Sequence, residues 1–196
     1  GKKAGQLWSG TFHSIFAKIL RKYSSLLGFP STFTIYDGSD AKNAIKLCIK
    51  ELQLDEKIYK PNVVLSRISA AKNNLVTAEA YMNNHVAIQN DMKSGKGKIC
   101  EVYRLYAKKC KTDSVMDFDD ILLYMNILLR DFPEVTSELR SQISHILVDE
   151  YQDTNMAQYH IVKKIAQESR NITVVGDDPQ STYAFRGARI QNILNF

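Results

Sequence analysis

The chain has 196 residues, of which 44% are hydrophobic and 24% are charged, and its formal net charge is +5. These proportions are close to those of an average soluble globular protein, so the chain can bury a hydrophobic core. No segment reaches the roughly 18 consecutive apolar residues that a membrane helix needs, and the N-terminus lacks the apolar region of a signal peptide. Composition therefore argues against a membrane partner and favours a cytoplasmic location.

The three cysteines, Cys48, Cys100 and Cys110, have neither the close spacing of a zinc site nor the even number of a disulfide set. We expect free thiols and no structural metal.

Positive charge is concentrated in the middle of the chain. Residues 37–111 hold 14 Lys/Arg and 8 Asp/Glu, a net charge of +6, whereas the remaining residues hold 12 and 13, a net charge of −1. This segment is predicted to present a surface to a polyanion. The alternative is a set of lysine-rich helix faces that are simply solvated.

The N-terminal third combines extended and helical patterns. Residues 7–11 are a short strand candidate, and apolar spacing predicts a helix over residues 12–27 that ends at Gly28. Residues 33–36 form a brief extended connection, after which Asp37 or Ser39 is expected to cap a helix over residues 40–53.

The middle of the chain is predicted to be entirely helical. Apolar residues between 63 and 71 share one helix face, and further helices are expected over about 78–90 and 99–110, with a flexible basic turn at residues 93–98 between them. Asp117 is expected to cap a helix that runs through Leu129, and Pro133 is expected to mark a loop.

The C-terminal part is predicted to hold a β-α-β unit. Two apolar runs, residues 145–148 and 172–175, flank a helix over about residues 155–168. Both runs are too short to alternate, which is typical of parallel strands covered on both faces.

Acidic residues follow each of these two runs, Asp149-Glu150 after the first and Asp177-Asp178 after the second. Ligands bind beyond the carboxyl ends of strands in open parallel sheets. There Asp149 suits Mg²⁺ and Glu150 could polarise a water for attack on a phosphate. Alternatively, these acids only terminate strands and cap helices.

Five segments resemble conserved motifs of the UvrD/Rep-like superfamily 1 DNA helicases. Residues 146–155, Ile-Leu-Val-Asp-Glu-Tyr-Gln-Asp-Thr-Asn, resemble motif II, and residues 174–188 resemble motif III. Residues 8–14, which in the family include a strand before an inserted helical domain, and residues 33–37 and 116–123, which flank the insertion, also match. The resemblance implies an α/β fold in which residues 1–36 and 112–196 form part of a RecA-like P-loop NTPase domain with a parallel sheet. Residues 37–111 would be an all-α inserted subdomain.

The resemblance also implies roles in an ATP site. Asp149 would bind the Mg²⁺ of MgATP, Glu150 would activate the hydrolytic water, and Gln180 would sense the γ-phosphate. Arg186 would lie near the boundary between nucleotide and DNA.

A second implied set of residues contacts single-stranded DNA. Thr11 and His13 match positions that donate to phosphate oxygens, although strand packing is an equal alternative for Thr11. Tyr183 and Phe185 would stack on bases, and Phe185 replaces the larger Trp of many relatives.

The implied function is ATP-driven, 3′-to-5′ translocation on single-stranded DNA, with unwinding at junctions between single and double strands. The family's Gly-x-x-x-x-Gly-Lys-Ser/Thr phosphate loop does not occur in these 196 residues. We therefore expect the chain to be a piece of a longer helicase and to be inactive alone. The alternatives are part of a helicase–nuclease subunit and a non-catalytic DNA-binding module.

Overall fold

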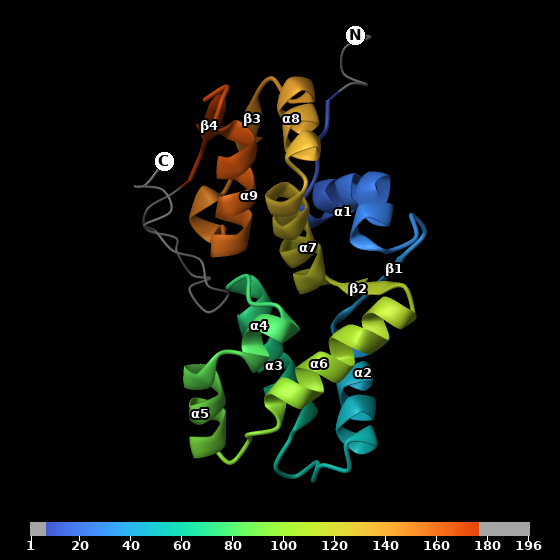
Figure 1. Ribbon diagram of the computed structural model, residues 1–196. Coiled ribbons are helices and arrows are strands. Elements are labelled where there is room, and N and C mark those ends of the chain that lie inside the picture. The colour runs from blue at the N-terminus through green and yellow to red at the C-terminus, as the bar shows by residue number, and fades with distance from the viewer. Residues whose placement is uncertain (1–6, 177–196) are drawn as a thin grey trace.

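The structure is a computed structural model that describes residues 7–176 (Figure 1). In chain order its elements are α1 (Phe12–Tyr23), η2 (Ser24–Leu27), β1 (Thr34–Tyr36), α2 (Gly38–Glu51), α3 (Pro61–Asn73), α4 (Ala78–Met82), α5 (His85–Lys93), α6 (Ile99–Thr112), β2 (Val115–Asp117), α7 (Phe118–Asp131), α8 (Pro133–Gln142), β3 (Ile146–Val148), η3 (Tyr151–Asp153), α9 (Met156–Ala166) and β4 (Ile172–Val174). The fold is mostly helical with small parallel sheets, in agreement with the α/β prediction at this coarse level.

Two groups of elements lie at opposite ends of the molecule in Figure 1. Helices α2 to α6 form one group, and α1, α7, α8, α9 and the β3–β4 pair form the other. Each group surrounds its own hydrophobic cluster, one built from residues 41–110 and the other from residues 16–33 and 116–165. The chain thus leaves the second group after β1 and returns to it at β2.

The connection between the groups is a pair of parallel strands. β1 and β2 pair in the register Thr34↔Val115, Ile35↔Met116 and Tyr36↔Asp117. The segment predicted as an extended connection is therefore a paired strand. Its partner, β2, ends at Asp117. Asp117 is also the N-cap of α7, and this cap was predicted from the sequence.

Capping explains where several helices begin. Asp37 and Asp117 are the N-caps of α2 and α7, and each takes part in a reciprocal capping box with the aspartate three residues later. Helix α1 passes into η2, and Gly28 ends that segment with φ of 68°, a left-handed conformation that favours glycine.

The strand predicted for residues 7–11 is wrong, because residues 7–11 form no strand in the structure. Leu7 and Trp8 are 70% and 41% exposed, and Gly10 has φ of 150°. Apolar residues favour a strand only where another strand accepts their backbone hydrogen bonds. None of the strands described between residues 7 and 176 pairs with this segment.

Two helix predictions are also corrected. The single helix expected over residues 78–90 is two helices, α4 and α5, because Asn84 accepts a hydrogen bond from Ala87 N and starts a new helix. Pro133 begins helix α8 rather than a loop, since proline at the first helical position needs no hydrogen bond from its nitrogen.

The prediction that the C-terminal strands are covered on both faces is wrong for the described residues. β3 and β4 are parallel, as predicted, with the register Ile146↔Ile172, Leu147↔Thr173 and Val148↔Val174. Val148 is buried against α9 residues, but Leu147 is 73% exposed. Helix α9 therefore covers one face of this pair.

Candidate functional site

The predicted acidic pair lies at the carboxyl end of β3. Asp149 and Glu150 directly follow Val148, and both side chains are exposed. The backbone N–H of Glu150 donates to Asp149 Oδ1 at 2.9 Å, which orients that carboxylate. The pair is thus in a turn beyond a parallel strand and not in a helix.

The neighbouring strand holds this turn in place. Val175 N donates to Val148 O at 2.8 Å, and Tyr151 N donates to Val175 O at 2.9 Å. Glu150 has φ of 48°, an uncommon conformation for a residue other than glycine. The backbone bonds on both sides keep the chain in this conformation, so the acidic turn has a defined shape.

Gly176, just after β4, packs closely against the same turn. A Cβ atom added at Gly176 would lie 2.5 Å from Gln152 Oε1 and 3.3 Å from Tyr151 N. A larger residue would require the Gln152 side chain to move and the Tyr151 backbone to shift by a few tenths of an ångström, so position 176 favours a small residue.

The oxygen ligands of this region fit a hard cation. Mg²⁺ in nucleotide sites is held by one or two protein carboxylates together with phosphate oxygens and water. Asp149 supplies an exposed, oriented carboxylate, and Asp153 Oδ1 is buried and accepts no hydrogen bond in the described structure. No group of three or more His, Cys, Asp or Glu side chains suited to a metal occurs within residues 7–176. Within this part of the chain, a cation bound by Asp149 would take its remaining ligands from phosphate oxygens and water.

Thr11 is the N-cap of α1. Its Oγ1 accepts from Ser14 N at 3.3 Å, and Ser14 Oγ donates to Thr11 O at 2.8 Å. A Cβ at Gly10 would lie 2.5 Å from Ser14 Oγ, so glycine allows this tight start. The Thr11 hydroxyl accepts in the cap, and its own proton can still be donated to a ligand.

His13 lies in the first turn of α1. Its ring packs edge-on against Phe118, with centroids 5.4 Å apart. Burial lowers the pKa of His13, although the Asp119 charge and a hydrogen bond with the Phe118 backbone act to raise it. Its ring is therefore neutral at pH 7 and carries one N–H, which the hydrogen bond with the Phe118 backbone already uses.

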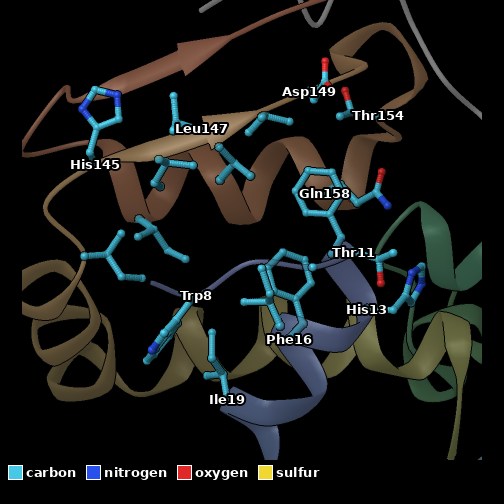
Figure 2. A pocket seen from close by; sticks show the side chains of 18 of the residues that line it. Trp8, Thr11, His13, Phe16, Ile19, His145, Leu147, Asp149, Thr154 and Gln158 are labelled. Atoms are coloured by element: carbon cyan, nitrogen blue, oxygen red, sulfur yellow. The ribbon is translucent and has the colours of Figure 1, made fainter. Parts of the chain in front are cut away.

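One cavity of about 790 Å³ brings these predicted residues together. It is lined by Thr11 and His13 from α1 and by Asp149 and Glu150 beyond β3, with apolar side chains between them. Figure 2 shows Thr11 and His13 toward the same end of the cavity as Asp149, while Trp8 lies toward the other end. The remaining predicted site residues, Gln180, Tyr183, Phe185 and Arg186, lie outside the described residues.

Comparison with known proteins identifies the family of the chain. The family model for the UvrD/REP helicase N-terminal domain matches residues 1–196. The chain belongs to this family. It is 39% identical over 193 residues to an ATP-dependent DNA helicase PcrA of Leuconostoc citreum, covering 98% of the chain and 25% of that protein.

Similar values are found for two further relatives named ATP-dependent DNA helicase PcrA. The chain is 38% identical over 196 residues to that of Staphylococcus epidermidis and 37% identical over 196 residues to that of Staphylococcus aureus, in each case covering 100% of the chain and 26% of the relative. The chain thus spans about a quarter of the length of the curated relatives it matches.

The UvrD/REP helicase domain also has contacts at this site that sequence reasoning missed. Asn155 is the N-cap of α9, accepting from Gln158 N at 2.9 Å, and its Nδ2 donates to Asn73 Oδ1 at 2.7 Å. Asn73 Nδ2 in turn donates to Asp119 Oδ1 at 2.7 Å. The pattern Asn-x-x-Gln at residues 155–158 could have identified the cap, but nothing in the sequence around Asn73 indicates its partners.

No helix within residues 7–176 of this UvrD/REP domain is both long enough and apolar enough to span a bilayer.

Proposed function

We propose that the chain is part of the N-terminal motor region of an ATP-dependent DNA helicase that moves 3′-to-5′ on single-stranded DNA and opens duplex at junctions. Residues 1–36 and 112–196 would belong to a RecA-like P-loop ATPase domain, and residues 37–111 would form its helical insertion. The observation that carries the proposal is that an acidic turn beyond a parallel strand and the start of α1 face one cavity.

In the proposed ATP site, Asp149 would hold the Mg²⁺ of MgATP, which supplies positive charge to the phosphate oxygens. Glu150 would accept the proton of the attacking water, and Gln180 would sense the γ-phosphate. The left-handed backbone of Glu150 and its flanking bonds to β4 support this role, since a general base acts only from a defined position.

In the proposed DNA site, the Thr11 hydroxyl would donate to a phosphate oxygen, and His13 would contact the DNA beside it. Tyr183 and Phe185 would stack on bases, and Arg186 would act between the two sites. The exposure of Thr11 at the start of α1 supports this assignment.

The proposal is tested in the full-length protein that contains this chain. Glu150→Gln is expected to lower kcat for DNA-stimulated ATP hydrolysis by about 10²- to 10⁴-fold, because the amide cannot accept the proton of water. The Kd for MgATP is expected to change little, because Glu150 is not assigned to the metal. The measurement is steady-state ATPase activity together with equilibrium nucleotide binding.

Glu134→Gln is the matched control, since Glu134 is exposed in the first turn of α8, away from the cavity lining. Wild-type activity in Glu150→Gln would overturn the assignment. The 196 residues alone are expected to show no ATP turnover, because backbone N–H groups and the loop lysine of a phosphate loop are needed to hold the triphosphate. Turnover by this chain that Glu150→Gln abolishes would contradict that expectation.

A further inference from the structure

Three side chains outside the cavity lining connect α9 to α7 through α3, a helix of the α2–α6 group. Asn155 Nδ2 donates to Asn73 Oδ1, and Asn73 Nδ2 donates to Asp119 Oδ1, both at 2.7 Å. Asn73 is the last residue of α3 and lies 82 positions from Asn155 in the sequence. One amide from α2–α6 thus touches both α9 and α7.

Each end of this chain of hydrogen bonds adjoins a predicted functional segment. Asn155 caps α9 immediately after η3, and η3 follows the acidic turn at Asp149 and Glu150. Asp119 follows Phe118, whose ring contacts His13 at the start of α1. A shift of either segment would therefore stretch a hydrogen bond to Asn73.

The geometry leaves Asn73 little freedom to change its bonds. Its Nδ2 also donates to Ser69 O at 2.9 Å, so both amide protons and the oxygen have partners. Asn155 Oδ1 accepts the capping hydrogen bond from Gln158 N, and this leaves Asn155 Nδ2 directed toward Asn73. Asn73 therefore holds Asn155 and Asp119 in one relative arrangement, and substitutions along such networks alter the coupling between sites.

We propose that Asn73 is a positioning residue that links the acidic turn after β3 to the DNA-facing start of α1, so that DNA binding raises ATP turnover. This inference rests on the proposed function. Neither Asn73 nor α3 lines the cavity, so the residue would act only through Asn155 and Asp119.

The test measures ATP turnover of the full-length protein with and without single-stranded DNA. Asn73→Ala is expected to lower the stimulation by DNA by about 2- to 30-fold, the range found for substitutions along coupling networks. Turnover without DNA and the KM for ATP are expected to stay at wild-type values. Asn74→Ala is the matched control, because Asn74 is exposed and donates only within its own helix, to Ala70 O.

Asn155→Asp provides a second variant that preserves folding. Aspartate keeps the oxygen that caps α9 but removes the donor to Asn73. If the amide of Asn73 turned to bind the new carboxylate, it would no longer bind Asp119, so the link is broken in either case. The double variant Asn73→Ala/Asn155→Asp is expected to lose no more stimulation than either single variant, because both interrupt one path.

Stimulation within twofold of wild type in Asn73→Ala would overturn the inference. A parallel fall in turnover with and without DNA would also overturn it, since that outcome indicates a purely structural role. Losses that multiply in the double variant would show independent effects and would reject the single path. Absence of DNA-stimulated turnover in the wild-type protein would instead reject the proposed function.

Discussion

Lys72 is a buried cation at the contact between the two groups of elements. Its side chain is 2% exposed, and its Nζ lies 2.7 Å from both Asp117 Oδ2 and Asp120 Oδ1. The hydroxyl of Tyr106 donates to Asp117 Oδ2 at 2.7 Å. Lys72 therefore joins α3 to both acidic residues of the α7 capping box.

The pKa values of the two aspartates in this cluster are shifted in opposite directions. Burial acts to raise the pKa of Asp117, but the Lys72 charge and hydrogen bonds from Lys72 and Tyr106 outweigh it and leave that pKa lowered. Burial and the neighbouring Asp117 charge raise the pKa of Asp120 to about 7, against the opposing effect of Lys72. One carboxylate is thus firmly ionised, while the second gains a proton far more readily than in the unfolded chain.

Asp120→Asn is expected to change how stability depends on pH. Because the folded pKa of Asp120 is above its ordinary 3.8, its contribution is fully present below about pH 4 and is lost as pH rises toward 7. The variant lacks this contribution, so its free energy of unfolding should fall less between pH 4 and 7 than that of the wild type. Urea unfolding at a series of pH values measures the difference.

The control for this experiment is Asp40→Asn. Asp40 occupies the same position in the capping box of α2, but it is exposed. If Asp40→Asn and Asp120→Asn alter the pH profile equally, the effect does not come from burial beside Lys72.

At the scale of elements, helix α8 supplies hydrogen-bond donors to a carbonyl group near the C-terminal end of α9. The last carbonyl groups of a helix lack partners within that helix. Arg140 of α8 donates from Nε and Nη2 to Lys164 O near the end of α9, at 3.1 and 2.8 Å. Its side chain is only 18% exposed, and it also pairs with Glu168. These bonds hold α8 against the helix that follows the acidic turn.

Arg140→Met is expected to lower the free energy of unfolding by about 1–3 kcal/mol, since it removes charged hydrogen bonds and leaves a carbonyl without a partner. Arg130→Met is the control, because Arg130 is 63% exposed and pairs with the adjacent Asp131. That exposed pair is expected to contribute about 0–1 kcal/mol. Equal losses in the two variants, measured by urea unfolding, would contradict a capping role for Arg140.

At the scale of the whole molecule, the basic charge is concentrated in the same part of the chain that forms a separate hydrophobic cluster. The helical group α2–α6 has its own hydrophobic cluster, and residues 37–111 carry the basic excess of 14 Lys/Arg over 8 Asp/Glu. The other group holds the cavity with the acidic turn. A polyanion would therefore be attracted mainly to the helical group.

Binding of a single-stranded oligonucleotide to this chain is expected to weaken steeply with salt, as binding to phosphates releases counterions. Lys93→Ala/Lys96→Ala, at the end of α5 and in the turn that follows it, should reduce the slope of log affinity against log salt by about 0.7 for each phosphate that the protein no longer neutralises. Lys18→Ala/Lys163→Ala, exposed positions outside residues 37–111, is the control. A slope unchanged by the first pair would indicate that these lysines are only solvated.

Local sequence patterns determined most helices, the cap at Asp117, and the β-α-β unit with Asp149 and Glu150 at a strand end. They left Asp37 and Ser39 as alternative caps of α2, and the structure has Asp37 in that role. These features depend on neighbours a few residues apart, which periodicity and capping signals record. The family motifs also depend on short runs of residues, and these runs alone identify the UvrD/REP domain.

Only the tertiary structure decided which distant segments meet. Thr34 pairs with Val115 across the whole helical group, Lys72 is buried between two aspartates, and Asn73 meets Asn155. The apolar pattern of residues 7–11 predicted a strand, but the segment is exposed and forms none. A strand needs a partner, and the local sequence does not specify one. Contacts between residues far apart in the chain depend on how whole elements pack, and a local pattern carries no record of that packing.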